Sequence, residues 1–208
     1  MARYHDSVCR LCRREGTKLF LKGTRCYTKK CSVERRPSPP GQHGVRRRKM
    51  SDFGTHLREK QKFRRVYSVM ERQFKDYFAI ARSRPGVTGE NLLRLLELRL
   101  DNAVYRMGFA TSRPMARQLV GHGHFAVNGV PTDIPSYQLR AGDRVEVVDS
   151  SRSLEPFKNA RSQMGAAPRP EWLAVDPEHL SATIAALPRR DQMPLELNEQ
   201  LVVEYYSR

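Results

Sequence analysis

The sequence predicts an α+β fold, in which a mainly helical body carries an inserted module of two helices and a small β-hairpin. Apolar residues recur at helical spacing between residues 51 and 107, and an alternating pattern surrounds an Asn-Gly pair at residues 128 and 129. All four cysteines precede these elements. We therefore expect four parts: an N-terminal segment (1–45), a helical body (46–98), the inserted module (99–170), and a C-terminal segment that packs back on the body and completes it (171–208).

The N-terminal segment contains two close cysteine pairs, Cys9 with Cys12 and Cys26 with Cys31, separated by 13 residues. This spacing lets four thiolates converge tetrahedrally on one ion, and it leaves no coordination position open for catalysis. The segment has few large apolar residues, so a metal cross-link would supply its order. We expect one structural zinc ion, and an iron-sulfur cluster on the same four cysteines stays open because spacing alone does not exclude it.

Two other uses of the cysteines fit the sequence less well. Structural disulfides need an oxidising compartment, for which the chain offers no indication. A redox-active Cys9-x-x-Cys12 motif is typical of a βαβ fold, and it would leave Cys26 and Cys31 without a role. A structural metal therefore accounts best for the set.

Positive charge dominates the chain and is unevenly distributed. The formal net charge is +16. Residues 1–49 hold 15 Lys and Arg against 3 Asp and Glu, whereas residues 50–208 hold 23 against 19. Charge that served only solubility would be mixed in sign, so the asymmetry indicates a polyanionic partner. No run approaches the ~20 apolar residues that span a bilayer, and no signal peptide opens the chain; we expect a cytoplasmic protein without a membrane partner.

The body begins after a proline-rich loop, residues 35–44, that favours an extended path. Helices are expected from Ser51 to about Tyr67, from Glu71 to Arg84, and as one long leucine-rich helix from Thr88 to Gly108. The basic run before the first helix and the basic side chains on it are candidates for phosphate contacts, namely Arg46, Arg47, Arg48, Lys49, Arg58, Lys62 and Arg65.

The module contains a well-bounded helix and a hairpin. Ser112 suits the N-cap and Gly123 the left-handed position after the C-terminus. One face of this helix should pack, while Arg113 and Arg117 should lie on another face. Asn128-Gly129 suits a type I′ turn, and a strand is expected over residues 145–148.

Three elements are expected after the module. A short helix over residues 153–164 should precede a strand from Trp172 to Val175. Asp176-Pro177-Glu178 has the composition of a helix start, with an end near Leu187. The apolar stretch 195–206 should pack back on the helical body, because so apolar a segment would not stay exposed.

The module resembles a small RNA-binding module shared by a ribosomal protein, some tRNA synthetases and many pseudouridine synthases. The resemblance rests on Ser112-Arg113, Ala116-Arg117, Leu119-Val120, the run Gly121-His122-Gly123-His124, Val127-Asn128-Gly129 and Gly142-Asp143. It implies that the second helix and the hairpin edge dock on structured RNA, through Arg113, Arg117, Gln118, His122, His124 and Asn128. The alternative from the residues alone is that the two arginines form a solvated helix face.

The chain as a whole is similar to the bacterial small-subunit ribosomal protein S-four family, in its cysteine-bearing variety. The cysteine segment, RRPSPPGQHG, REKQKFRR, the module and the terminal NEQLVVEYYSR follow in that order. The resemblance implies a primary binder of small-subunit rRNA that nucleates assembly of the 5′ domain and acts with protein S-five on translational accuracy. It also implies other small-subunit proteins and mRNA, where the mRNA enters the ribosome, as neighbours. Metal binding would order the segment that carries Arg10, Arg13, Arg14, Arg35 and Arg36.

Two other function classes share some of these features. A pseudouridine synthase carries the same module, but the rest of the chain offers no sheet-rich catalytic domain and no acid-base set, so we expect no enzyme and no small-molecule substrate. A zinc-finger DNA-binding regulator would explain the cysteines and the charge, yet neither a helix-turn-helix nor a two-fold dimer signal is evident.

Overall fold

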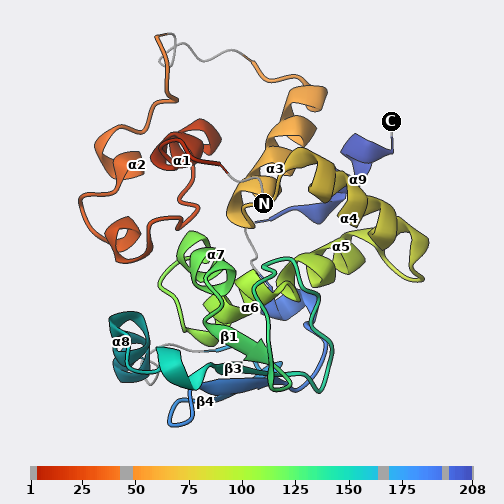
Figure 1. The fold of residues 1–208 in the computed structure, drawn as a ribbon. Coiled ribbons are helices and arrows are strands. Elements are labelled where there is room, and N and C mark those ends of the chain that lie inside the picture. Colours follow the sequence, from red (N-terminus) through yellow and green to blue (C-terminus); the bar gives the residue numbers. More distant parts are fainter. Residues whose placement is uncertain (1–3, 43–48, 164–168, 194–196, 208) are drawn as a thin grey trace. The chain divides into compact units, whose positions relative to one another are not determined.

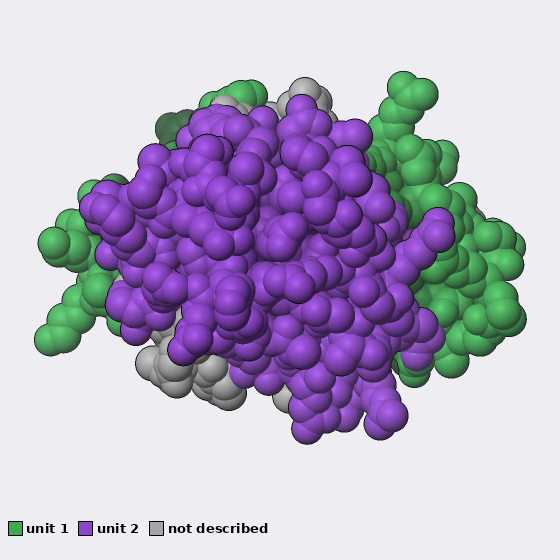
Figure 2. Space-filling model, turned by 60° about the horizontal axis from the view of Figure 1, so that its bottom comes forward, with its two compact units in different colours: residues 1–92, 194–208 green, residues 93–193 purple. Residues whose placement is uncertain are grey.

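A computed structural model of the chain describes residues 4–42, 49–163, 169–193 and 197–207. The chain divides into two compact units, and each is described by itself. Unit 1 comprises residues 1–92 and 194–208, and unit 2 comprises residues 93–193; Figure 2 colours them separately. No helix in the described ranges is long and apolar enough to cross a membrane.

The N-terminal part of unit 1 is built from short elements around the cysteines. They are α1 (Cys9–Glu15), the 3-10 helix η1 (Gly23–Tyr27) and α2 (Ser32–Arg35). Gly16, with φ +69°, ends α1 in the left-handed conformation that glycine adopts without steric cost. The four cysteines are free thiols. Disulfides are therefore absent among them.

The helical part of unit 1 follows the predicted pattern. Helix α3 (Asp52–Val66) begins at Ser51, whose side chain accepts a hydrogen bond from the Gly54 amide, and α4 (Glu71–Ser83) buries Phe74, Tyr77, Phe78 and Ala81. The C-terminal helix α9 (Glu199–Tyr206) packs along α3, as Figure 1 shows, and stacks Tyr206 on Phe78 with ring centroids 4.6 Å apart. The prediction that the terminal segment packs on the helical body is confirmed for residues 197–207; Leu195 lies outside the described residues.

The prediction of one long helix from Thr88 to Gly108 is wrong in one respect, because the segment forms two helices. Helix α5 (Thr88–Glu97) crosses from unit 1 to unit 2, and α6 (Leu100–Met107) follows after Arg99, whose ψ of 138° is extended. The amides of Leu100 and Asp101 donate to the carbonyls of Tyr137 and Pro135, at 2.9 and 3.1 Å. The backbone thus bonds to a later loop at this point instead of continuing the helix.

The module's helix and hairpin form as expected. Helix α7 (Arg113–Gly121) starts at Ser112, whose hydroxyl accepts from the Met115 amide. Strands β1 (Phe125–Val127) and β2 (Val130–Pro131) are joined by Asn128 and Gly129, which have φ +52° and +79°. These positive angles are those of the predicted type I′ turn.

The sheet extends beyond the expected hairpin. Strands β3 (Arg144–Val147), β4 (Leu173–Asp176) and β5 (Ser181–Ile184) join it, and the described strands follow the order β2-β1-β3-β5-β4 with antiparallel neighbours. The 3-10 helix η2 (Asp149–Ser151) and α8 (Glu155–Gln163) lie between β3 and β4, and η3 (Arg190–Gln192) follows β5. The core of unit 2 is centred on four fully buried rings, those of Phe109, Phe125, Phe157 and Trp172.

The prediction of a helix that starts at Asp176 is wrong, because strand β5 forms within the predicted range. The Asp176 carboxylate accepts hydrogen bonds from the amides of Glu178 and His179, as an N-cap would, at 3.0 and 3.2 Å. The chain then turns back through Leu180, which has φ +49°, and pairs with β4 and β3. Residues 173–184, expected to complete the helical body, therefore belong to the sheet of unit 2.

Candidate functional site

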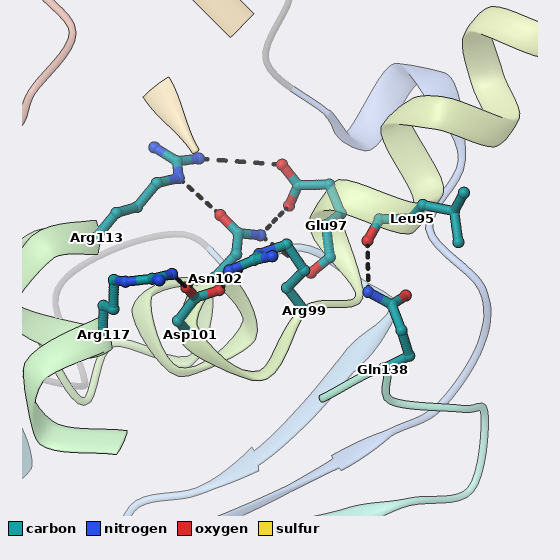
Figure 3. A network of polar contacts seen from close by, with 8 residues as sticks. All are labelled: Leu95, Glu97, Arg99, Asp101, Asn102, Arg113, Arg117 and Gln138. Carbon is teal, nitrogen blue, oxygen red and sulfur yellow. Dashed lines mark hydrogen bonds and ion pairs between the residues drawn. The ribbon is translucent and has the colours of Figure 1, made fainter. Parts of the chain in front are cut away.

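Asp101, in the first turn of α6, binds two guanidinium groups at the centre of a buried polar network in unit 2 (Figure 3). Arg99 donates to both carboxylate oxygens, at 3.0 and 2.7 Å, and Arg117 of α7 donates to Oδ2 at 2.9 Å. Arg99 and Asp101 are buried. Ion pairs without access to water are costly to break, so this contact fixes α7 against α6.

Glu97 organises a second group of contacts beside the first. Its carboxylate accepts two hydrogen bonds from Arg106, at 2.8 and 2.9 Å, and one from the Asn102 side chain at 2.9 Å. The Asn102 carbonyl oxygen in turn accepts from Arg113 Nε at 2.6 Å, and the Arg113 guanidinium stacks over the Tyr105 ring, 4.6 Å from its centre. Helices α6 and α7 are thus joined at two points.

The expectation that Arg113 and Arg117 form an exposed face of α7 is therefore wrong. They are only 9% and 8% exposed. They bind Asn102 and Asp101 of α6, and Arg113 also lies 4.0 Å from Glu97 at the end of α5. The i, i+4 spacing placed them correctly on one face, but it could not indicate that this face turns inward. Sequence reasoning missed their partners Glu97, Asp101 and Asn102, because no local pattern connects residues 97–102 with residues 113–117.

The exposed part of the module lies at the end of α7 and along the hairpin. Gln118 and His122 are exposed, as expected for contact residues. His124 is partly buried, with its Nδ1 2.9 Å from the Ser151 hydroxyl. Burial and the neighbouring His122 lower the pKa of His124 from its ordinary 6.5. This shift favours the neutral imidazole, which acts through hydrogen bonds.

Asn128 is exposed but also has a structural role in the hairpin. Its side-chain carbonyl accepts the Arg144 amide at 2.8 Å, and its amide group donates to the Asp143 carboxylate at 2.9 Å. The turn of β1 and β2 is thereby tied to the start of β3. Any contact with RNA would use a side chain that is already held in place.

The arginines of the N-terminal segment are mostly available to solvent. Arg10, Arg14, Arg35 and Arg36 are exposed, as is Lys49 ahead of α3. Arg13 is partly buried and donates to the carbonyls of Ser38 and Pro39, at 2.9 and 3.4 Å, so it orders the proline-rich loop. The expected phosphate contacts of Arg46, Arg47 and Arg48 lie outside the described residues.

The candidates on α3 are paired with acidic side chains. Arg58 and Arg65 both donate to Glu15 of α1, and Lys62 lies 3.7 Å from Glu59. Burial raises the pKa of Glu15 above its ordinary 4.5, although Arg65 and Arg58 act in the opposite direction. Burial likewise lowers the pKa of Arg65. Within unit 1, Arg58 and Arg65 therefore fasten the cysteine segment to α3.

The four predicted metal ligands line one pocket, together with Leu21 and Lys22 among others. The Lys22 amide donates to Cys26 Sγ at 3.4 Å, and burial is the main reason that the pKa of Cys12 is raised from 9.0. In the described ranges, however, no group of three or more Cys, His, Asp or Glu residues has the arrangement of a metal site. The donor set suits zinc in its chemistry, because it consists of four sulfur atoms. The metal centre therefore stays a prediction.

Comparison with known proteins gives matches along the whole chain. Residues 3–97 match the family described as "Ribosomal protein S4/S9 N-terminal domain", and residues 98–145 match the "S4 domain". A small ribosomal subunit protein uS4 from Thermodesulfovibrio yellowstonii is 58% identical over 208 residues, with 100% of both chains covered. Proteins of the same name from Syntrophomonas wolfei and Ruminiclostridium cellulolyticum are 57% and 56% identical, again over 100% of both chains. The chain belongs to the bacterial ribosomal protein uS4 family.

Proposed function

We propose that this chain is a structural constituent of the small ribosomal subunit and binds small-subunit rRNA in the cytoplasm. The observation that carries the proposal is its end-to-end match with proteins named for that subunit. A uS4 protein is a ribosomal component and not an enzyme. The pseudouridine synthase alternative is therefore not favoured.

The mechanism is recognition of folded RNA by charge and shape. Exposed Arg10, Arg14, Arg35 and Arg36 release counterions from phosphates, which gives an affinity that falls with salt. Residues 99–149, the part of the module that holds its two helices and its hairpin, contain 6 basic and 5 acidic residues and contribute little net charge. The contribution of the module is a rigid surface around Gln118 and His122, because structured RNA is recognised through shape and unpaired bases.

Arg113 and Arg117 act in this mechanism as positioning residues. Their guanidinium groups are bound to Asn102 and Asp101, so they hold α7 in the orientation that presents Gln118. Asn128 and His124 contact the RNA through hydrogen bonds in this mechanism. Lys62 and Lys49 contribute charge from α3 and the residues before it.

The finer proposals concern the place of the protein in the subunit. By its resemblance to the family, we propose that it grasps a helical junction of the 5′ domain early in assembly and adjoins protein S-five, with an effect on translational accuracy. Other small-subunit proteins, and mRNA where it enters the ribosome, are the further proposed partners.

A binding competition tests the main proposal. Purified protein is titrated by filter binding with folded small-subunit rRNA and with duplex DNA of equal length at moderate salt. Preference for the rRNA by at least tenfold is expected. Equal affinity for both would favour the zinc-finger DNA-binding alternative, and modification of the added RNA would favour the enzyme alternative.

We also propose that Cys9, Cys12, Cys26 and Cys31 hold one zinc ion, which would cross-link the N-terminal segment. Their common pocket and the uniform sulfur donor set support this. Elemental analysis of the native protein should find about one zinc per chain. Iron in place of zinc would indicate an iron-sulfur cluster. The absence of both metals would refute the proposal. Cys12→Ser should then increase amide exchange in residues 4–42 and leave α3 and α4 protected.

A further inference from the structure

Tyr27 is the most exposed of the large apolar and aromatic side chains in the described ranges, at 72%. Its ring stacks on Phe20, with centroids 5.1 Å apart and the ring planes inclined by 30°. One tyrosine face is thus supported by another ring, while most of the side chain remains open to solvent. A single exposed aromatic residue needs no explanation, but this one rests on a second ring within a stretch of exposed cations.

Both rings are held by ordered backbone. Phe20 has φ +51°, a conformation that is rare for a bulky residue, and the buried side chains of Leu19 and Leu21 anchor it on either side. After Tyr27, the amide and hydroxyl of Thr28 donate to the Arg25 carbonyl, at 3.3 and 3.0 Å. The platform therefore exists before a ligand arrives, so little ordering entropy is lost on binding.

The stretch of chain that carries the pair is basic, and the Glu34 carboxylate just beyond it pairs with Lys18. Residues 16–33 contain five Lys and Arg and no Asp or Glu. Of these, Lys22, Arg25, Lys29 and Lys30 lie within five residues of Tyr27 and are exposed. An aromatic face among cations has the chemistry that binds single-stranded nucleic acid, where a base stacks and its phosphates meet the charges. A protein partner of ordinary mixed charge would not match this surface.

We propose that the stacked pair of Phe20 and Tyr27 is a platform for one unpaired base of RNA, with the exposed face of Tyr27 as the contact. The inference rests on the proposed function and adds a site within the cysteine segment, outside the module. Stacking does not distinguish one base from another, because every base offers a face for it. Specificity would therefore come from the position of the unpaired base in the RNA fold.

The test measures the affinity of full-length variants for folded small-subunit rRNA over a range of salt concentrations. Tyr27→Leu keeps apolar cover over Phe20 and removes the aromatic face, so affinity should fall by about 5- to 150-fold. Tyr27→Phe should bind as the wild type does. Because no phosphate contact is lost, the slope of log affinity against log salt should be unchanged in Tyr27→Leu, whereas Lys29→Ala should reduce its magnitude by about 1. Tyr4→Leu, at another exposed tyrosine, is the matched control.

Chemical probing of the same complexes supplies the second measurement. One unpaired base protected by the wild type should become reactive in Tyr27→Leu, with all other protections kept. Wild-type affinity of Tyr27→Leu, a lowered salt slope, or an unchanged protection map would each overturn the platform. If the wild-type protein shows no preference for rRNA over duplex DNA, both the proposed function and the platform fail. If the wild type prefers rRNA but Tyr27→Leu binds it equally well, the platform alone fails.

Discussion

Arg117 Nη1 lies 2.9 Å from Asp101 Oδ2, and this contact joins α7 to the first turn of α6 inside unit 2. Asp101 also binds buried Arg99 through both oxygens. A residue that the sequence suggested as an RNA contact is therefore a structural element of the module.

We predict that Asp101→Ala lowers the free energy of unfolding by about 3 to 5 kcal/mol, because two buried guanidinium groups lose their carboxylate. Arg117→Ala should cost less, about 1 to 3 kcal/mol, since Asp101 keeps Arg99. Urea denaturation measures both. Lys158→Ala, at an exposed pair with Glu155, is the control and should cost under about 0.5 kcal/mol. A cost for Asp101→Ala no larger than that of the control would contradict the structural role of the network.

Replacing Asn128 by alanine should destabilise the protein more than replacing it by glycine. Asn128→Ala loses the bond to the Arg144 amide and places alanine at φ +52°, so a destabilisation of about 1 to 3 kcal/mol is expected. Asn128→Gly relieves the backbone strain and should cost less. Thermal unfolding of the two variants measures the difference. A larger loss of stability in Asn128→Gly than in Asn128→Ala would contradict the positive φ angle at this turn position.

Gly89 allows α9 to approach α5 closely within unit 1. A Cβ atom at this position would lie 2.7 Å from Glu199 Cγ and 3.0 Å from Glu199 Cβ. We predict that Gly89→Ala destabilises the protein by about 1 to 3 kcal/mol and speeds amide exchange in α9. Gly54→Ala is the matched control, because its Cβ would meet Ser51 Oγ at 3.4 Å and helix propensity favours alanine. Equal protection of α9 in the two variants would refute the close packing.

Stability should fall in acid partly through Glu71. Burial acts to raise its pKa, but the hydrogen bond and charge of Lys60, the charge of Arg64 and the Tyr206 hydroxyl together lower it from 4.5. The folded state thus binds this proton less tightly than the unfolded chain. The resulting stabilisation is present above pH 4.5 and is lost as the pH falls through the lower folded value.

Glu71→Gln should therefore be less stable than the wild type at neutral pH and should lose less stability between pH 5 and pH 3. Chemical denaturation at several pH values measures this slope. Glu155→Gln, at an exposed pair, serves as the control. A slope for Glu71→Gln equal to that of the wild type would exclude a contribution from this carboxylate.

The sequence predicted those elements whose signals are local. Ser51 and Ser112 cap their helices, and Asn128-Gly129 forms the turn that its composition favours. The break at Arg99 and strand β5 were not predictable in this way, because both depend on backbone bonds to residues distant along the chain. Asp176 illustrates the difficulty, since an aspartate that accepts two following amides begins a tight turn as readily as a helix.

The candidate site was predictable in its charge and less so in its geometry. The basic excess of residues 1–49 follows from counting, and Arg10, Arg14, Arg35 and Arg36 are indeed exposed. The inward direction of Arg113 and Arg117 depends on Asp101 and Asn102, and their burial emerges only from the packing of α6 on α7. Glu15, which binds Arg58 and Arg65, is a similar case across 43 and 50 residues.

A protection map of small-subunit rRNA with and without the protein is the decisive measurement of whether a shaped surface on this chain recognises folded RNA. We expect the protected nucleotides to cluster at one helical junction of the 5′ domain, and we expect this cluster to persist when salt weakens the overall affinity. Scattered protection, of the kind that a simple polycation gives, would contradict the claim that a shaped surface on this chain recognises the RNA.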